Sequence, residues 1–194
     1  DTVVAYGNIN MTANKGTIDV SGKVKSTSGG INVKTNSANQ TTSNASISYD
    51  AEETVANDEE VREHFDIMIG EELAANQSII ITTDSGDIEI TEPIIVNSGN
   101  ITISTANGDI KINTDGSENM LSAQNDLNIL TERGAVLISG KISTLDGNIT
   151  ITANKDSYTA GQENISVDDD GAINSGKNIS LNITNGDVHI TDKF

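Results

Sequence analysis

Apolar and polar residues alternate in short runs that return at regular spacing along the chain. Ile101–Ser104 reads Ile-Thr-Ile-Ser and Ile149–Thr152 reads Ile-Thr-Ile-Thr, the period of two that is typical of a strand with one buried face. Strands of this kind are predicted to begin at Ile9, Ile31, Ile79, Ile101, Leu127, Ile149 and Ile179. Because three of the intervals between successive starts are 22 residues long, the pattern indicates an internal repeat.

Each repeat contains two further predicted strands. A second strand begins nine residues after the first, at Ile18, Ile88, Ile110, Val136 and Val188, with a weaker match at Tyr158. Two positions before these strands stand Gly16, Gly86, Gly108, Gly134 and Gly186, as a tight turn requires. A third strand follows at Val24, Ile94 and Ile142. Three strands in about 22 residues predict an all-β fold, a right-handed parallel β-helix of about seven coils, with residues 1–194 as a single domain.

The register predicts which side chains are buried. Successive coils of a β-helix stack their inward residues about 4.8 Å apart. The predicted inward residues include Ile90, Ile103, Ile112, Ile138, Ile151 and Ile190, and the predicted exposed residues include Thr102, Glu89, Lys111 and Thr150.

Three coils are longer than the others. Extra residues are predicted around 115–119 and around 168–176. The second coil has the largest number of extra residues, and its residues 50–75 are rich in acidic side chains. There Val61, Phe65, Met68, Ile69 and Leu73 have helical spacing. This predicts an inserted α-helix over 50–75, whose apolar face is a candidate partner-binding element.

Charge excludes several functions. The chain has 29 acidic and 11 basic residues and a formal net charge of −18. Such a surface repels nucleic-acid phosphates and anionic lipids, so neither nucleic-acid binding nor membrane insertion is expected. Cysteine is absent and aromatic residues make up 3% of the chain.

The repeats resemble those of a known group of proteins. GNITI, GDIKI, GTIDVSGKV and KNISLNITNGDVHI are similar to the shaft repeats of filamentous-haemagglutinin-type and high-molecular-weight bacterial adhesins, which are exported by two-partner secretion. The resemblance implies a non-enzymatic adhesive segment, secreted or on the bacterial cell surface. Its partner would be a receptor or glycan on a host or neighbouring cell. The NPNL and NPNGI signatures of the export domain are absent, which favours shaft or tip.

Asparagines supply the main candidate sites. N-x-[ST] sequons begin at Asn10, Asn39, Asn44, Asn76, Asn100, Asn148, Asn164, Asn178 and Asn182. They fit either a corner followed by a strand or sites of glycosylation. Three of them, Asn100, Asn148 and Asn178, share one predicted corner column, so attached sugars would form a stripe.

Candidates for other chemistry are few. Asp168-Asp169-Asp170 is the densest carboxylate cluster, which fits a solvated turn or a Ca²⁺ ligand set. His64 and His189 have no sequence neighbours that suggest a relay or a metal pair. No catalytic residue, cofactor or metal site is therefore predicted.

Two other functions of β-helices remain as alternatives. A polysaccharide-active enzyme needs paired carboxylates on one sheet face, and a glycan-binding module would use a similar face. Ice binding needs unbroken threonine stripes. Thr150 and Thr152 fit such a stripe, but Asn10, Asn32, Lys34 and Leu130 interrupt the same columns.

Strand-like alternation continues to both ends, at residues 2–6 and 187–191. A β-helix end exposes unpaired backbone groups and an aliphatic cross-section. The pattern therefore predicts either a segment of a longer shaft or a chain that meets copies of itself end to end in a fibre.

Overall fold

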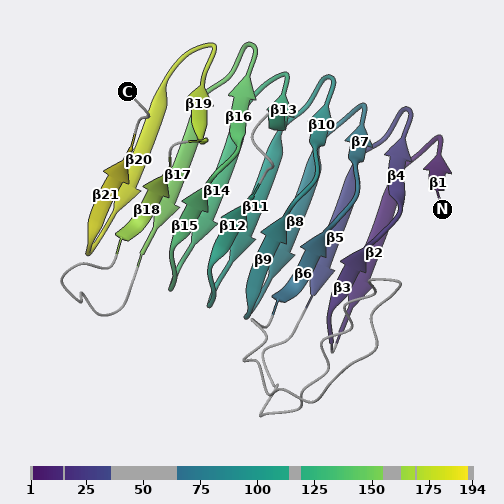
Figure 1. Cartoon of the computed structure of the whole chain (residues 1–194). Coiled ribbons are helices and arrows are strands. Elements are labelled where there is room, and N and C mark those ends of the chain that lie inside the picture. Colours follow the sequence, from purple (N-terminus) through teal and green to yellow (C-terminus); the bar gives the residue numbers. More distant parts are fainter. Residues whose placement is uncertain are drawn as a thin grey trace.

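The chain forms a parallel β-helix in a computed structural model that describes residues 2–14, 16–35, 65–113, 119–154, 163–168 and 170–191. Within these ranges the secondary structure consists of strands, without a helix, arranged in three parallel sheets of seven strands each. The coils stack in one direction, with β1 at one end and β21 at the other (Figure 1).

The strands of each sheet come from successive coils. Sheet A consists of β1 (Thr2–Ala5), β4 (Lys23–Ser26), β7 (Leu73–Ala75), β10 (Ile94–Val96), β13 (Asn119–Ala123), β16 (Lys141–Thr144) and β19 (Ala172–Asn174). Sheet B consists of β2 (Ile9–Ala13), β5 (Ile31–Thr35), β8 (Ile79–Thr83), β11 (Ile101–Thr105), β14 (Leu127–Thr131), β17 (Ile149–Ala153) and β20 (Ile179–Ile183). Sheet C consists of β3 (Ile18–Val20), β6 (Phe65–Ile69), β9 (Asp87–Ile90), β12 (Ile110–Ile112), β15 (Val136–Ile138), β18 (Glu163–Val167) and β21 (Asp187–Ile190).

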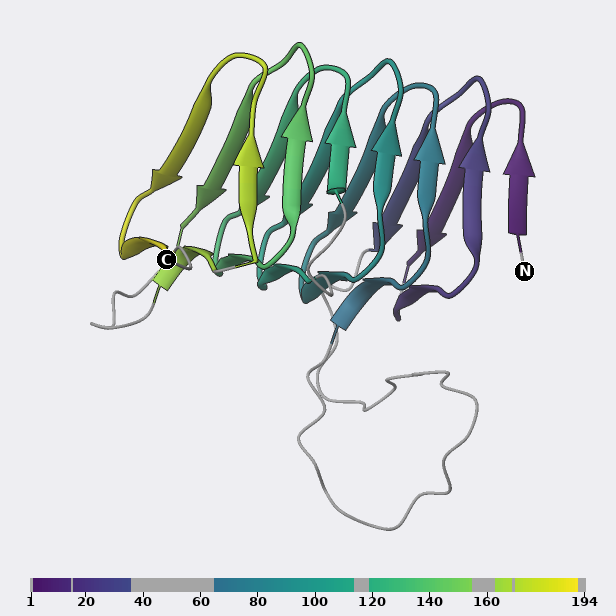
Figure 2. The ribbon, with the colours of Figure 1, turned by 45° about the horizontal axis from the view of Figure 1, so that its top comes forward.

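The predicted register is confirmed in all three sheets. All seven predicted first strands form sheet B, the five main second strands lie in sheet C, and the three predicted third strands lie in sheet A. The chain passes through A, B and C once per coil, so each strand pairs in parallel with strands of the coils before and after it (Figure 2).

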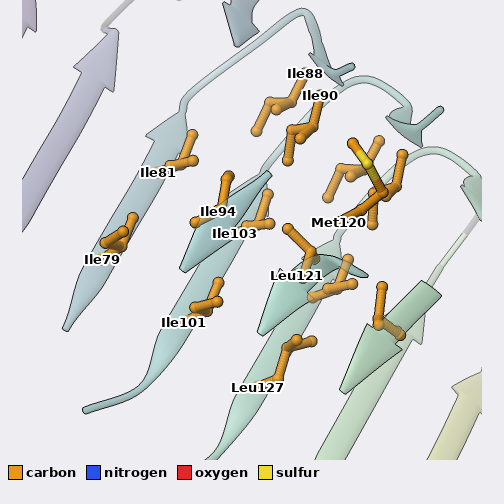
Figure 3. Close-up of a cluster of buried hydrophobic side chains, with 14 of the residues drawn as sticks. Ile79, Ile81, Ile88, Ile90, Ile94, Ile101, Ile103, Met120, Leu121 and Leu127 are labelled. Atoms are coloured by element: carbon orange, nitrogen blue, oxygen red, sulfur yellow. The ribbon is translucent and has the colours of Figure 1, made fainter. Parts of the chain in front are cut away.

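The core is a set of aliphatic columns that run through the stack. In sheet B, Ile81, Ile103 and Ile129 stand opposite one another, and each is at most 1% exposed. Figure 3 shows isoleucines and leucines of sheets A, B and C meeting inside the coils. Met120 joins them beside a bulge in β13, where its flexible thioether side chain fills an irregular space.

The predicted inward residues are buried, with one exception. Ile90, Ile103, Ile112, Ile138 and Ile151 are at most 1% exposed. Ile190 points into the same column as Val167, but it is 63% exposed because it belongs to the last coil. The predicted outward residues Thr102, Glu89, Lys111 and Thr150 are partly exposed, since each has neighbours on adjacent strands.

The predicted helix over residues 50–75 is wrong for its described part. Residues 65–69 form β6 and residues 73–75 form β7, while Val61 lies outside the described residues. Ile69 and Leu73 are fully buried in the columns of sheets C and A, and Met68 points outward. The second coil still needs its own strands in both sheets. The apolar residues at 67, 69, 73 and 75 meet that need with the period of two of a strand, while the four-residue spacing of Ile69 and Leu73 also fits one face of a helix.

Two smaller predictions are also corrected. Val136 of sheet C is followed in its column by Ile165 of β18, and the weaker match at Tyr158 lies outside the described residues. The extra residues of that coil therefore precede β18. The stretch 168–176, predicted to hold them, contains β19 instead. Of the extra residues predicted at 115–119, those at 115–118 do fall between β12 and β13, while Asn119 begins β13.

Glycine is required at the corners for two different reasons. Gly16, Gly86, Gly108 and Gly186 have positive φ angles of 102°, 97°, 153° and 122°, which disfavour other residues. At Gly134 the reason is close approach instead, because a Cβ would lie 2.0 Å from the carbonyl oxygen of Gly108 in the coil before.

Candidate functional surface

A column of polar side chains lines the corner between sheets A and B. The residue just before each sheet-B strand is Asn8, Gly30, Ser78, Asn100, Asp126, Asn148 or Asn178. Gly30 has no side chain, but at Asn8, Ser78, Asn100 and Asp126 the side-chain oxygen accepts the backbone N–H of the same position in the next coil. Asn100 Oδ1 accepts from Asp126 N at 3.1 Å, and Asp126 Oδ1 accepts from Asn148 N at 2.8 Å. We call this set of residues the corner ladder.

Asp126 is the charged member of the corner ladder. Besides the Asn148 backbone N–H, its Oδ1 accepts the Asn148 side-chain Nδ2 at 3.1 Å. These hydrogen bonds lower the pKa of Asp126 below its ordinary value of 3.8, against the opposing effect of desolvation, and the positive charge of Lys177 adds a smaller lowering effect. The carboxylate therefore stabilises the stacking of coils in its charged form.

Acid is expected to weaken this contact. Because the folded-state pKa is depressed, the stabilisation is present above the unfolded-state pKa and is lost as pH falls through the folded-state pKa. Asp126→Asn keeps an acceptor oxygen but does not titrate, so its unfolding free energy should fall less between neutral pH and pH below 3.8. Urea unfolding of both proteins measures this difference. An identical pH dependence would contradict the assignment, and NMR titration of the Asp126 carboxyl checks its pKa directly.

The three candidate glycosylation sites do share this column, as predicted. Asn178 donates its Nδ2 to Asn148 Oδ1 at 3.0 Å, while Asn148 donates its own Nδ2 to Asp126. The amide nitrogens that a sugar would need are therefore hydrogen-bonded within the corner ladder at these two residues.

The other sequons differ in access. Asn10 and Asn182 are exposed on the outer face of sheet B, Asn76 is half-buried, and Asn164 is 1% exposed. Asn39 and Asn44 lie outside the described residues. Of these two exposed residues, Asn182 donates its Nδ2 to Thr152 Oγ1 at 3.5 Å.

A buried threonine column was not predicted from the sequence. Thr35, Thr83, Thr105 and Thr131 end successive sheet-B strands and are at most 4% exposed. Thr105 donates to the Gly86 carbonyl at 3.0 Å and Thr131 to the Gly108 carbonyl at 2.7 Å, each in the coil before. The sequence contained the pattern, because extending the period of two by one step places a threonine inward four residues after four of the seven predicted starts, at Ile31, Ile79, Ile101 and Leu127. These hydroxyls satisfy corner carbonyls and hold coils together.

The remaining candidates do not converge on a chemical site. Asp168 accepts the Ser139 hydroxyl at 2.5 Å and the Asp170 backbone N–H at 3.1 Å, as a turn residue would. Among the described residues, no group of three or more His, Asp and Glu side chains is placed to hold a metal ion. His189 points outward from β21 beside Ser166, and His64 lies outside the described ranges.

The outer face of sheet C carries the carboxylates that an enzyme would have to use. Asp19 and Glu89 belong to one column but are separated by Met68 of the coil between them. Glu89 accepts the Asn113 side-chain amide at 2.8 Å. In this outward column Asp19 and Glu89 therefore do not stand on adjacent strands, as a carboxylate pair for glycoside hydrolysis would.

The outer face of sheet B is nearly uncharged. Its strands point two residues each outward: Asn10, Thr12, Asn32, Lys34, Ile80, Thr82, Thr102, Ser104, Asn128, Leu130, Thr150, Thr152, Ser180 and Asn182. Lys34 is the single charged residue among them. Ile80 and Leu130 are 42% and 37% exposed. A molecule with a net charge of −18 thus presents a broad, nearly uncharged face on sheet B.

Within the part of the chain that the structure describes, no helix is long and apolar enough to cross a membrane. Comparisons of the chain with protein-family models, with curated proteins and with solved structures gave no significant match.

Proposed function

We propose that the chain is a structural and adhesive segment of a secreted or cell-surface bacterial filament or adhesin, and that the outer face of sheet B is its contact surface. The observation that carries the proposal is the neutral outer face of sheet B on a strongly acidic molecule. The resemblance of the repeats to adhesin shafts supports the same role.

A neutral face suits contact with another cell. Cell surfaces are commonly anionic, so an acidic molecule approaches them best through a face without its own negative charge. Charged residues are also depleted at the centres of protein interfaces. Because the same two outward positions recur in seven strands, weak contacts to a repeating receptor or glycan add along the stack.

The rest of the fold serves rigidity. The corner ladder and the threonine column bond each coil to its neighbours, while the aliphatic columns exclude water from the interior. A rigid rod of this kind keeps its contact face at a defined orientation and distance.

A charge placed on the contact face is expected to weaken adhesion. Thr150→Glu adds one negative charge on the outer face of sheet B. Ser143→Glu adds the same charge in the same coil, on the outer face of sheet A. Both positions are partly exposed, so both variants should remain folded. Binding of the labelled chain to recipient cells should fall several-fold for Thr150→Glu and stay near wild type for Ser143→Glu.

Equal binding by the two variants would contradict the proposal that the outer face of sheet B is the contact surface. The wider proposal depends on location as well as binding. Immunogold labelling of the producing cells is expected on their exterior. Labelling confined to the cell interior, together with the absence of cell binding, would refute an adhesive role. Release of sugars from polysaccharides by the purified chain would favour the enzymatic alternative instead.

A further inference from the structure

We propose that the outer face of sheet B packs against the same face of a second copy of this chain, so that two copies lie face to face along their stacks. The inference rests on the proposed contact face and names its partner: a copy displayed on a neighbouring cell. It is carried by the distribution of charge around the β-helix, by the hydrogen-bonding chemistry of the face and by the spacing of its rows.

The strands of sheet B contain no acidic residue. In the seven described strands from β2 to β20, Lys34 is the one outward charged side chain. The described acids lie instead in sheet C, such as Asp19 and Glu89, or in the corners between sheets, such as Glu92. Two copies that each carry a net charge of −18 repel one another on those sides. They meet the least repulsion when their sheet-B faces approach.

Sheet A is less suited to pairing with itself. Its described strands also lack acids, but Lys23 and Lys25 point outward from β4 and Lys141 points outward from β16. Packing this face on its copy would bring together like charges. Its strands are three to five residues long, whereas every strand of sheet B has five. Sheet B is therefore both the less charged and the wider of these two faces.

The outward side chains of sheet B are complementary to themselves. All of them except Lys34, Ile80 and Leu130 are Asn, Ser or Thr. Amides and hydroxyls both donate and accept hydrogen bonds, so a face of such groups can bond to an identical face, as a face of one charge cannot. Among the described residues, the side chains of Thr102 and Thr150 have no hydrogen-bonding partner within the chain. Their hydroxyls are open to a second copy.

Two apolar side chains add to the contact. Ile80 and Leu130 are 42% and 37% exposed. A second face that covers them removes this apolar surface from water. Lys34 is compatible with the contact because it is the fourth of five residues in β5, and its long side chain can place the ammonium group at the rim.

The rows of two copies have the same spacing. Strand pairing places the outward residues in two rows along the stack, one through Thr102 and Asn128 and the other through Ser104 and Leu130. Neighbours within a row are about 4.8 Å apart, the distance between adjacent strands. A second copy repeats this distance along the whole contact, so the side chains of the two sheets can interdigitate as in a steric zipper. A partner with a different repeat would drift out of register.

The size of the face fits a weak contact. Seven strands about 4.8 Å apart, with five residues of about 3.3 Å each, cover roughly 550 Å². Two copies would bury roughly 1,100 Å², near the lower limit of specific interfaces. Every coil contributes the same two outward positions, so the contact depends on how many coils overlap and not on where the stack begins or ends. Many copies on each cell would add their weak contacts.

Beads coated with the purified chain test the contact where weak contacts add. We expect wild-type beads to clump with one another at about 0.15 M salt and to leave uncoated beads free. Clumping should decrease at about 0.01 M salt, because the repulsion between copies with a charge of −18 is then less screened. Microscopy of beads in two colours measures both results.

Charged variants test whether the contact joins sheet B to sheet B. Thr102→Glu adds a negative charge to the face of every copy and should reduce clumping several-fold. Thr102→Glu beads should instead collect Thr102→Lys beads, because opposite charges then meet across the contact. Ser122→Glu adds the same charge in the next coil, on the outer face of sheet A, and should clump like wild type.

Three results would overturn the proposal. They are wild-type beads that do not clump at either salt concentration, equal clumping by Thr102→Glu and Ser122→Glu, and Thr102→Glu beads that do not collect Thr102→Lys beads. Circular dichroism checks that the variants are folded. If Thr102→Glu does not fold, Thr82→Glu adds the same charge to sheet B one coil earlier.

Recipient cells that do not display the chain separate this inference from the proposed function. Suppose that such cells bind the wild-type chain and not Thr150→Glu, while coated beads do not clump. The partner is then a different molecule, and the outer face of sheet B remains the contact surface. Clumping of coated beads without binding to these cells would support pairing between copies. Loss of both readouts would refute both proposals.

Discussion

Ile103→Ala is expected to lower the free energy of unfolding by about 2–5 kcal/mol, because a large side chain is removed from a closely packed interior. Ile103 is fully buried between Ile81 and Ile129 in the central part of the stack. Neighbouring coils are bonded to one another on both sides, so they have little freedom to collapse into the space.

Thr102→Ala is the matched control, since Thr102 is the adjacent residue on the outward side of the same strand. Its expected cost is within about 0.5 kcal/mol. Urea or thermal unfolding of the two variants measures both values. Equal costs would mean that the strand register is shifted by one residue, which would exchange the inner and outer faces.

Gly147→Ala is expected to destabilise the chain by about 1–3 kcal/mol or more through overpacking. A Cβ at Gly147 would lie 2.2 Å from both the carbonyl carbon and the oxygen of Asn125 in the coil before. Backbone atoms on both sides make this contact, so relief requires the coils to separate. Separation would also stretch the hydrogen bond between Asn148 N and Asp126 Oδ1.

Gly7 offers the control for this substitution. It occupies the same corner of the first coil, one residue before the corner-ladder position, and a Cβ there would meet nothing within 4 Å. Gly7→Ala should therefore leave the stability of the monomer nearly unchanged. Because Gly→Ala by itself lowers the entropy of the unfolded chain, comparable losses for both alanine variants in chemical denaturation would show that the cost comes from turn geometry and not from contact between coils.

The two pairs of variants probe different causes of stiffness. Ile103 reports on the aliphatic columns, and Gly147 reports on the close approach of successive corners. A rod that depends on both is suited to carry a contact face such as that of sheet B, because bending between coils would disturb buried layers and corner hydrogen bonds together.

Local alternation was sufficient to predict most of the fold. Ile101, Ile149 and their equivalents mark strand starts by a period of two, and corner glycines such as Gly86 mark the turns between them. The strand starts and the turns can be predicted without a structure because every coil must meet the same two local requirements. Aliphatic residues must face one side, and the chain must turn sharply at fixed intervals. The shared column of Asn100, Asn148 and Asn178 followed from the same register.

Contacts between coils decided what alternation left ambiguous. Residues such as Ile69 and Leu73 fit a helical period as well as a strand period, and only their pairing with Ile90 and Ile94 places them in β6 and β7. The burial of Thr105 depends on a carbonyl that the previous coil supplies. The long-range partner determines the secondary structure of such residues, because a short apolar run contains too few repeats of either period to distinguish a helix from a strand. A hydroxyl is likewise stable in a core only where it finds an acceptor, and for Thr105 the previous coil supplies that acceptor.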